Sequence, residues 1–132
     1  MQRRFGIPAA LFGLIAVLAG AFGAHALRGR LPAEALQTLE TGARYLMYHA
    51  LALLFVSRAA MAPGISRTVP TAGWLFTAGA PIFSGSLFAL ALTGVRAWGA
   101  ITPIGGVCLL AGWASLAWGA CFATGTALRR LP

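Results

Sequence analysis

The sequence predicts an all-α integral membrane protein: a four-helix bundle with a short amphipathic surface helix between its first and second spans. Two compositional observations predict this class, because 59% of the 132 residues are hydrophobic and only 9% are charged, outside the range of ordinary soluble domains. The third observation is that the apolar residues form long runs, each near the roughly 20 residues that cross a hydrocarbon core. A chain of this length accommodates about four such spans, so we treat residues 1–132 as a single membrane domain.

The first predicted span covers about residues 5–27 and follows the pair Arg3 and Arg4. It resembles a secretion signal because "AHA" at residues 24–26 has the small-x-small pattern of a cleavage site. Its apolar stretch is nevertheless about 20 residues long, whereas the apolar region of a signal peptide has about 7 to 15. We therefore expect this segment to be retained as a membrane span.

A polar stretch follows, and within it residues 32–42 are predicted to form a short amphipathic helix lying on the membrane surface. Pro32 suits the first turn of a helix, and Glu34 suits its positive end. Glu40 precedes Arg44 by four residues, the favourable order for an exposed ion pair on a helix. With four spans, this surface helix faces away from the side that carries the termini.

The second predicted span, about residues 45–62, is short between its flanking charges. Arg44 and Arg58 are separated by about 21 Å of helix, less than the thickness of a hydrocarbon core. We expect both guanidinium groups to extend along their aliphatic stems to the membrane surface. The alternative is that Arg58 serves as a functional cation within the membrane.

The third and fourth predicted spans cover about residues 71–93 and 101–125. Pro81 lies near the middle of the third, where a kink or freed backbone carbonyls are expected. Pro103 is expected in the first turn of the fourth, where proline is harmless.

The arginines indicate how the chain is oriented. Ten basic residues against two glutamates give a net charge of +8, and the arginines lie at the ends of apolar runs. They are typical of membrane-edge anchors, so we expect the lipid bilayer as a partner and no nucleic acid. The side of the termini carries Arg3, Arg4, Arg58, Arg67, Arg129 and Arg130, against Arg28, Arg30, Arg44 and Arg96 on the other side. The positive-inside rule then predicts cytoplasmic termini.

Small residues recur every seven positions in each span and predict close helix packing. Gly6, Gly13 and Gly20 form such a row in the first span, and the fourth span has an equivalent glycine row at positions 105, 112 and 119. We therefore expect every helix to present a small face to the inside of the bundle. The large aromatic residues are then expected to face lipid, a partner or the membrane interface: Trp74, Phe76, Trp98, Trp113 and Trp118.

The residues available for chemistry are few. No Asp or Glu lies inside a predicted span, and no recognisable nucleophile, base and orienting acid occur together. Cys108 and Cys121 are about 20 Å apart along one helix, so they cannot form a disulfide with each other. We accordingly expect no enzymatic activity, and the pattern specifies no particular cofactor.

Two histidines are the candidate ligands. His25 ends the first span and His49 lies about one turn inside the start of the second, so both belong to one leaflet, and Cys108 enters the same leaflet. Imidazole and thiolate groups together could bind copper, zinc or haem iron, and an imidazole could hydrogen-bond to a quinone carbonyl. Tyr48 and Arg44 complete the candidate ligand set. The structural alternative is that each histidine bonds only to backbone, water or a neighbouring helix.

Three functions remain open on these grounds. The leading hypothesis is a scaffold or accessory subunit that packs with itself or with a larger membrane complex. A second is a protein that binds quinone, lipid, metal or haem through His25 and His49. A third is a transporter of small solutes, which the close glycine packing disfavours.

Four segments resemble a known family in order and spacing: "GAFGAHAL", "YLMYHALALL", "GWLFTAGAPIFSGSLFALALTG" and "ITPIGGVCLLAGW". They are similar to the domain-of-unknown-function 423 family of small, YgdD-like bacterial inner-membrane proteins, over about residues 6–119. The resemblance implies a four-helix inner-membrane protein and supplies no reaction. The chain departs from the family pattern at Leu46 and Pro81. The positions that match its motifs are His25, Tyr48, His49, Ser84, Gly85, Ser86, Thr102, Pro103, Gly105 and Gly106.

Overall fold

A computed structural model describes residues 2–128, and side-chain surroundings for residues 3–121. The described chain forms four α-helices: α1 (Gln2–Ala24), α2 (Ala33–Ala59), α3 (Thr68–Thr93) and α4 (Ala97–Leu128). The all-α prediction is therefore confirmed. Three helical segments are long and apolar enough to cross a membrane: Arg3–Ala24, Thr68–Thr93 and Ala97–Cys121.

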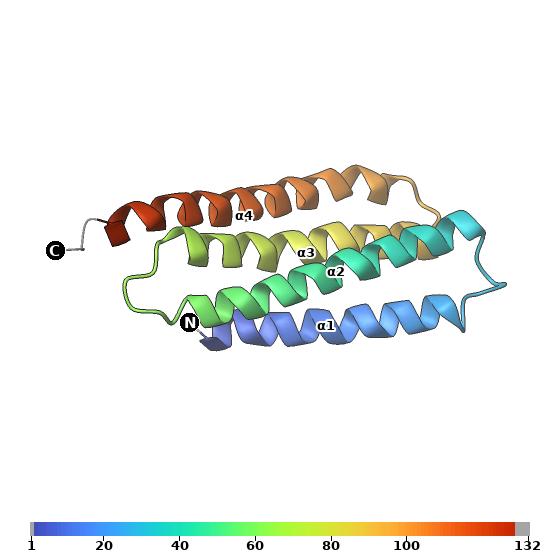
Figure 1. The fold of residues 1–132 in the computed structure, drawn as a ribbon. Helices are drawn as coiled ribbons and strands as arrows, with labels where there is room; N and C mark the ends of the chain where they lie inside the picture. The colour runs from blue at the N-terminus through green and yellow to red at the C-terminus, as the bar shows by residue number, and fades with distance from the viewer. Residues whose placement is uncertain (1, 129–132) are drawn as a thin grey trace.

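The helices pack in the order of the chain, as Figure 1 shows. Helix α1 lies against α2, α2 against α3, and α3 against α4, with a minor contact between α1 and α3. Within the described residues, no α-carbon of α4 comes within 8 Å of one in α1 or α2. The backbones of α2 and α4 therefore do not pack directly against each other. The start of α1 and the end of α4 lie at the same end of the molecule as the 60–67 loop (Figure 1).

The predicted surface helix at residues 32–42 is not a separate element, because α2 runs unbroken from Ala33 to Ala59. Neither a proline nor a helix cap separates residue 42 from residue 45. Gly42 instead packs on α3, where an added Cβ would lie 2.7 Å from the Phe88 ring and 3.2 Å from the Ser84 carbonyl oxygen. This close approach holds the polar first half of α2 against α3. That polar half also explains why α2 is not among the three apolar segments.

The glycine row of α4 is confirmed as a packing seam. A Cβ at Gly112 would lie 2.5 Å from the Phe76 ring, and one at Gly105 would overlap the Phe83 backbone. Any side chain larger than the hydrogen atom of glycine at these positions would push α3 and α4 apart. The row therefore sets the short distance between these two helices.

The glycine row of α1 does not face inward as predicted. A Cβ at Gly6 or Gly20 would meet no atom within 4 Å, and one at Gly13 would make only an ordinary contact of 3.9 Å with Ala50. Helix α1 instead buries an adjacent face that includes Phe5 and Ala9. The row lies along one side of the α1–α2 contact. Ala50 of α2 lies beside it there, and no further helix of the described chain packs beyond it.

Two further expectations need correction. Phe76 is fully buried rather than facing lipid, because Gly112 opposite it leaves room for the ring. Pro103 is not in the first turn of its helix, since α4 begins earlier, at Ala97.

Gly94 ends α3 in the left-handed conformation, with φ 69°. A residue with a Cβ adopts this conformation only at an energetic cost. Helix α4 follows after two residues.

Candidate functional site

His49 is the most constrained of the candidate ligands. It lies in the middle of α2 and is only 4% exposed. Its Nε2 accepts a hydrogen bond of 3.1 Å from Trp113 Nε1 on α4, and an indole N–H can only donate. The proton of the neutral ring must then lie on Nδ1, which is 2.7 Å from the carbonyl oxygen of Tyr45 and donates to it. Both ring nitrogens are thus occupied by contacts within the chain.

Aromatic rings surround this imidazole and join three helices. The His49 ring centroid lies 5.3 Å from that of Phe76 on α3, and Phe76 lies 5.2 Å from Trp113. Tyr45 stacks on the same imidazole, with ring centroids 6.3 Å apart. We refer to His49, Trp113, Phe76 and Tyr45 as the aromatic bridge, because it joins α2, α3 and α4 where the backbones of α2 and α4 remain apart.

The structure does not bring the other candidate ligands to His49. His25 lies in the exposed turn after α1, whereas His49 is about 24 Å along α2 from its first residue. Cys108 packs on α3, where a Cβ at Gly79 would lie 2.8 Å from its Cβ. Between residues 2 and 128 the described side chains include no group of three His, Cys, Asp or Glu that could hold a metal ion.

The remaining members of the candidate set are at the surface of α2. Arg44 pairs with Glu40 at 2.6 Å, as the four-residue spacing predicted. Both side chains are more than half exposed, so the pair adds a few tenths of a kcal/mol to stability. Tyr48 is 52% exposed and its ring centroid lies 6.0 Å from that of Tyr45.

The serine motif of α3 forms a second polar contact between helices. Ser86 Oγ lies 2.8 Å from the Phe83 carbonyl oxygen and 2.7 Å from Thr102 Oγ1 on α4. If Ser86 donates its single proton to the carbonyl, Thr102 must donate to Ser86. Ser84 differs, since its Oγ is buried with no hydrogen-bond partner among the described residues. Gly85 between them is exposed.

The family-motif positions on α4 do not all have the same surroundings. Gly105 is buried against Phe83, whereas a Cβ at Gly106 would make only an ordinary contact of 3.8 Å with that ring. Pro103 is exposed. Ser86, Thr102 and Gly105 therefore bring α3 and α4 together, and the side-chain polar groups at these motif positions are the hydroxyls of Ser84, Ser86 and Thr102.

Sequence reasoning identified His49 but missed its partner. Trp113 was expected to face lipid or a partner, and its side chain is indeed half exposed, yet its N–H points to His49. The only available signal was chemical: a buried imidazole needs a donor or acceptor, and an indole is one of the few donors in these spans.

Comparison with known proteins agrees with this architecture. The family described as "Protein of unknown function (DUF423)" matches residues 19–106. The UPF0382 membrane protein YwdK of Bacillus subtilis is 48% identical over 83% of this chain and 89% of its own length. The UPF0382 inner membrane protein YgdD of Escherichia coli is 42% identical over 86% of each chain.

A UPF0382 membrane protein of Haemophilus influenzae is 41% identical over 90% of this chain and 94% of its own length. No solved structure matches the chain. On the extent of these similarities, the chain belongs to the UPF0382 (DUF423) family of membrane proteins.

Proposed function

We propose that this protein is a membrane scaffold or accessory subunit that acts through helix packing, and that a second copy of the chain packs on the outer flank of α1. The proposal rests on one observation. The seven-residue glycine row of α1 has the same spacing as that of α4, yet Gly6 and Gly20 have open space around them. An equivalent row on α4 is filled by α3.

The composition of this flank supports contact with another helix. Ala10 and Ala24 are exposed and follow Gly6 and Gly20 by four residues, the small-xxx-small spacing that lets membrane helices approach closely. We define Gly6, Ala10, Gly13, Gly20 and Ala24 as the α1 small-residue row. Two copies would present identical rows, so the surface is complementary to itself.

The position of α1 in the fold also supports it. Helix α1 is at one edge of the packing order and has α2 as its main neighbour. Large apolar side chains cover the neighbouring outer surface, including Ile7, Leu14 and Leu18. A second α1 could use the small-residue row for close contact and these flanking side chains for packing around it.

We further infer that the termini face the cytoplasm. By sequence, six arginines belong to the side of the termini (Arg3, Arg4, Arg58, Arg67, Arg129 and Arg130) and four to the other side (Arg28, Arg30, Arg44 and Arg96). The positive-inside rule favours the side with more arginines for the cytoplasm. A membrane-impermeant thiol reagent applied to intact cells should fail to label Gln2→Cys and should label Arg30→Cys. Labelling of Gln2→Cys from outside would contradict the inference.

Native mass measurement after gentle extraction tests the association. We expect the wild-type chain to be larger than a monomer and Gly20→Leu to be a monomer. The matched control is Gly85→Leu, since Gly85 on α3 also has open space around it and tolerates a side chain without belonging to the row. A monomeric wild type, or equal mass for the two variants, would contradict the proposed self-association.

A further inference from the structure

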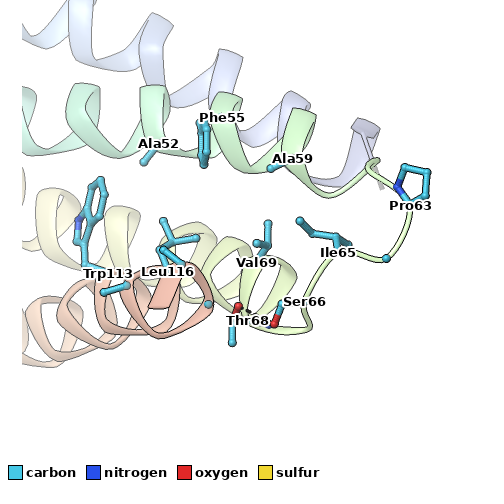
Figure 2. A pocket seen from close by; sticks show the side chains of 14 residues that line it. Ala52, Phe55, Ala59, Pro63, Ile65, Ser66, Thr68, Val69, Trp113 and Leu116 are labelled. Atoms are coloured by element: carbon cyan, nitrogen blue, oxygen red, sulfur yellow. Dashed lines mark hydrogen bonds between the residues drawn. The ribbon is translucent and has the colours of Figure 1, made fainter. Parts of the chain in front are cut away.

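A groove of about 720 Å³ lies between α2 and α4, on the side where these helices do not meet. Figure 2 shows Ala52 and Phe55 of α2 on one wall, and Trp113 and Leu116 of α4 on the other. Val69 of α3 lies between the two walls (Figure 2). Its volume is in the range of ligand-binding pockets, and its lining is almost wholly apolar. We call this feature the α2/α4 groove.

The groove is shorter than one leaflet. Along α4 it extends from Trp113 to Ala120, which is about 10 Å, whereas half of a hydrocarbon core is about 15 Å. Trp113, which bonds to His49, lines its deep end, and the 60–67 loop borders its other end (Figure 2). A partner's transmembrane helix would need a contact about 30 Å long, so the groove suits a chain confined to one leaflet.

Two arginines adjoin the lining residues at the loop end of the groove. Arg58 is next to Ala59, a lining residue, and Arg67 is flanked by two lining residues; both arginines are exposed. The sequence has only two acidic residues, Glu34 and Glu40, which lie near the start of α2 at the opposite end of the molecule (Figure 1). Basic residues beside a cleft between membrane helices favour anionic lipid headgroups.

We propose that the α2/α4 groove binds one acyl chain of an anionic phospholipid, with the lipid phosphate held between Arg58 and Arg67. Guanidinium groups suit phosphate because they donate two parallel hydrogen bonds to its oxygens. The aromatic bridge then acts as the stop at the acyl chain end, at the depth of Trp113. No residue of the α1 small-residue row lines this groove, so the lipid site can be tested independently of self-association.

Lipid retention by the full-length protein tests the proposal. Purified protein is equilibrated in mixed micelles containing equal amounts of phosphatidylglycerol and phosphatidylcholine with identical acyl chains, and bound lipid is measured by native mass spectrometry. We expect phosphatidylglycerol to be retained preferentially by the wild type. Arg67→Gln should weaken that preference about fivefold, and Arg96→Gln, at the other membrane surface, should leave it unchanged.

A second pair of variants tests the groove itself. Ala117→Phe fills it from α4, whereas Ala114→Phe places the same ring on an exposed α4 position outside it. Circular dichroism should show both variants folded, and only Ala117→Phe should lose the retained lipid. Equal retention of the two lipids by wild type, preferential retention of a neutral lipid or quinone, or full retention by Ala117→Phe would overturn the proposal.

Discussion

Trp113 Nε1 donates a hydrogen bond of 3.1 Å to His49 Nε2, and this contact joins α4 to α2 across a gap that their backbones do not close. The bond fixes the tautomer of the buried imidazole and gives both of its nitrogens a partner. His49 therefore connects α2 to α4 structurally in this conformation. The α2/α4 groove begins next to this hydrogen bond.

Removing only the indole N–H tests this link. Trp113→Phe keeps an aromatic ring against Phe76 and leaves His49 Nε2 without its donor, so the folded state should lose about 0.6 to 1.7 kcal/mol. Unfolding by sodium dodecyl sulfate in mixed micelles, followed by circular dichroism, measures the change. Trp74→Phe is the control, because exposed Trp74 contacts Phe5 mainly through its ring. Equal losses of stability in the two variants would show that the hydrogen bond between Trp113 and His49 makes no specific contribution.

The two serines of α3 should respond oppositely to the same substitution. Ser84 Oγ is buried without a partner, so Ser84→Ala should leave the free energy of unfolding unchanged or raise it. Ser86→Ala removes the contact with Thr102 and should lower it by about 0.5 to 1.5 kcal/mol. The same unfolding titration compares them, and greater damage from Ser84→Ala would contradict the assignment.

Adjacent glycines of α4 offer a third contrast. Gly105→Ala would force a methyl group into the Phe83 backbone, which should cost about 1 to 3 kcal/mol of stability. Gly106→Ala adds an ordinary contact and improves helix propensity by up to about 1 kcal/mol. Melting temperatures in one detergent should therefore fall for the first variant and hold or rise for the second. A similar fall in both would mean that the close contact at Gly105 is not decisive.

Metal should not stabilise the protein through His49. Ligand binding to the folded state raises the free energy of unfolding with the logarithm of the ligand concentration relative to Kd, but both His49 nitrogens are already bonded. Titration with Zn²⁺ or Cu²⁺ should leave the melting temperature of the purified full-length chain unchanged. A rise that His49→Gln abolishes would contradict this account and favour the metal-binding alternative.

The helical architecture was predictable because hydropathy and run length are local properties of the sequence. The continuity of α2 was not, since it depends on Gly42 packing against Phe88, which is remote along the chain. The local sequence predicted a polar surface helix followed by an apolar span, whereas the contact with α3 makes them one continuous helix. Likewise, a seven-residue glycine repeat predicts a packing surface without stating which helix fills it, as the rows of α1 and α4 demonstrate.

The candidate site was predictable only by residue type. A lone histidine in an apolar run indicates either a ligand or a satisfied internal contact, and the choice depends on Trp113, which is 64 positions away. The glutamate–arginine pair of α2 was predicted correctly, because a four-residue helical spacing determines that contact. Contacts set by one helix can be read from sequence, whereas those between helices required the fold.

Disulfide cross-linking in native membranes tests the central claim, self-association through α1, most directly. In a background carrying Cys108→Ala and Cys121→Ala, Ala10→Cys places a thiol in the α1 small-residue row, and Gly85→Cys places one on the exposed face of α3. Mild oxidation should convert the Ala10→Cys protein to a dimer and leave the Gly85→Cys protein monomeric on a non-reducing gel. Absence of the Ala10→Cys dimer, or equal dimer at both positions, would contradict the claim.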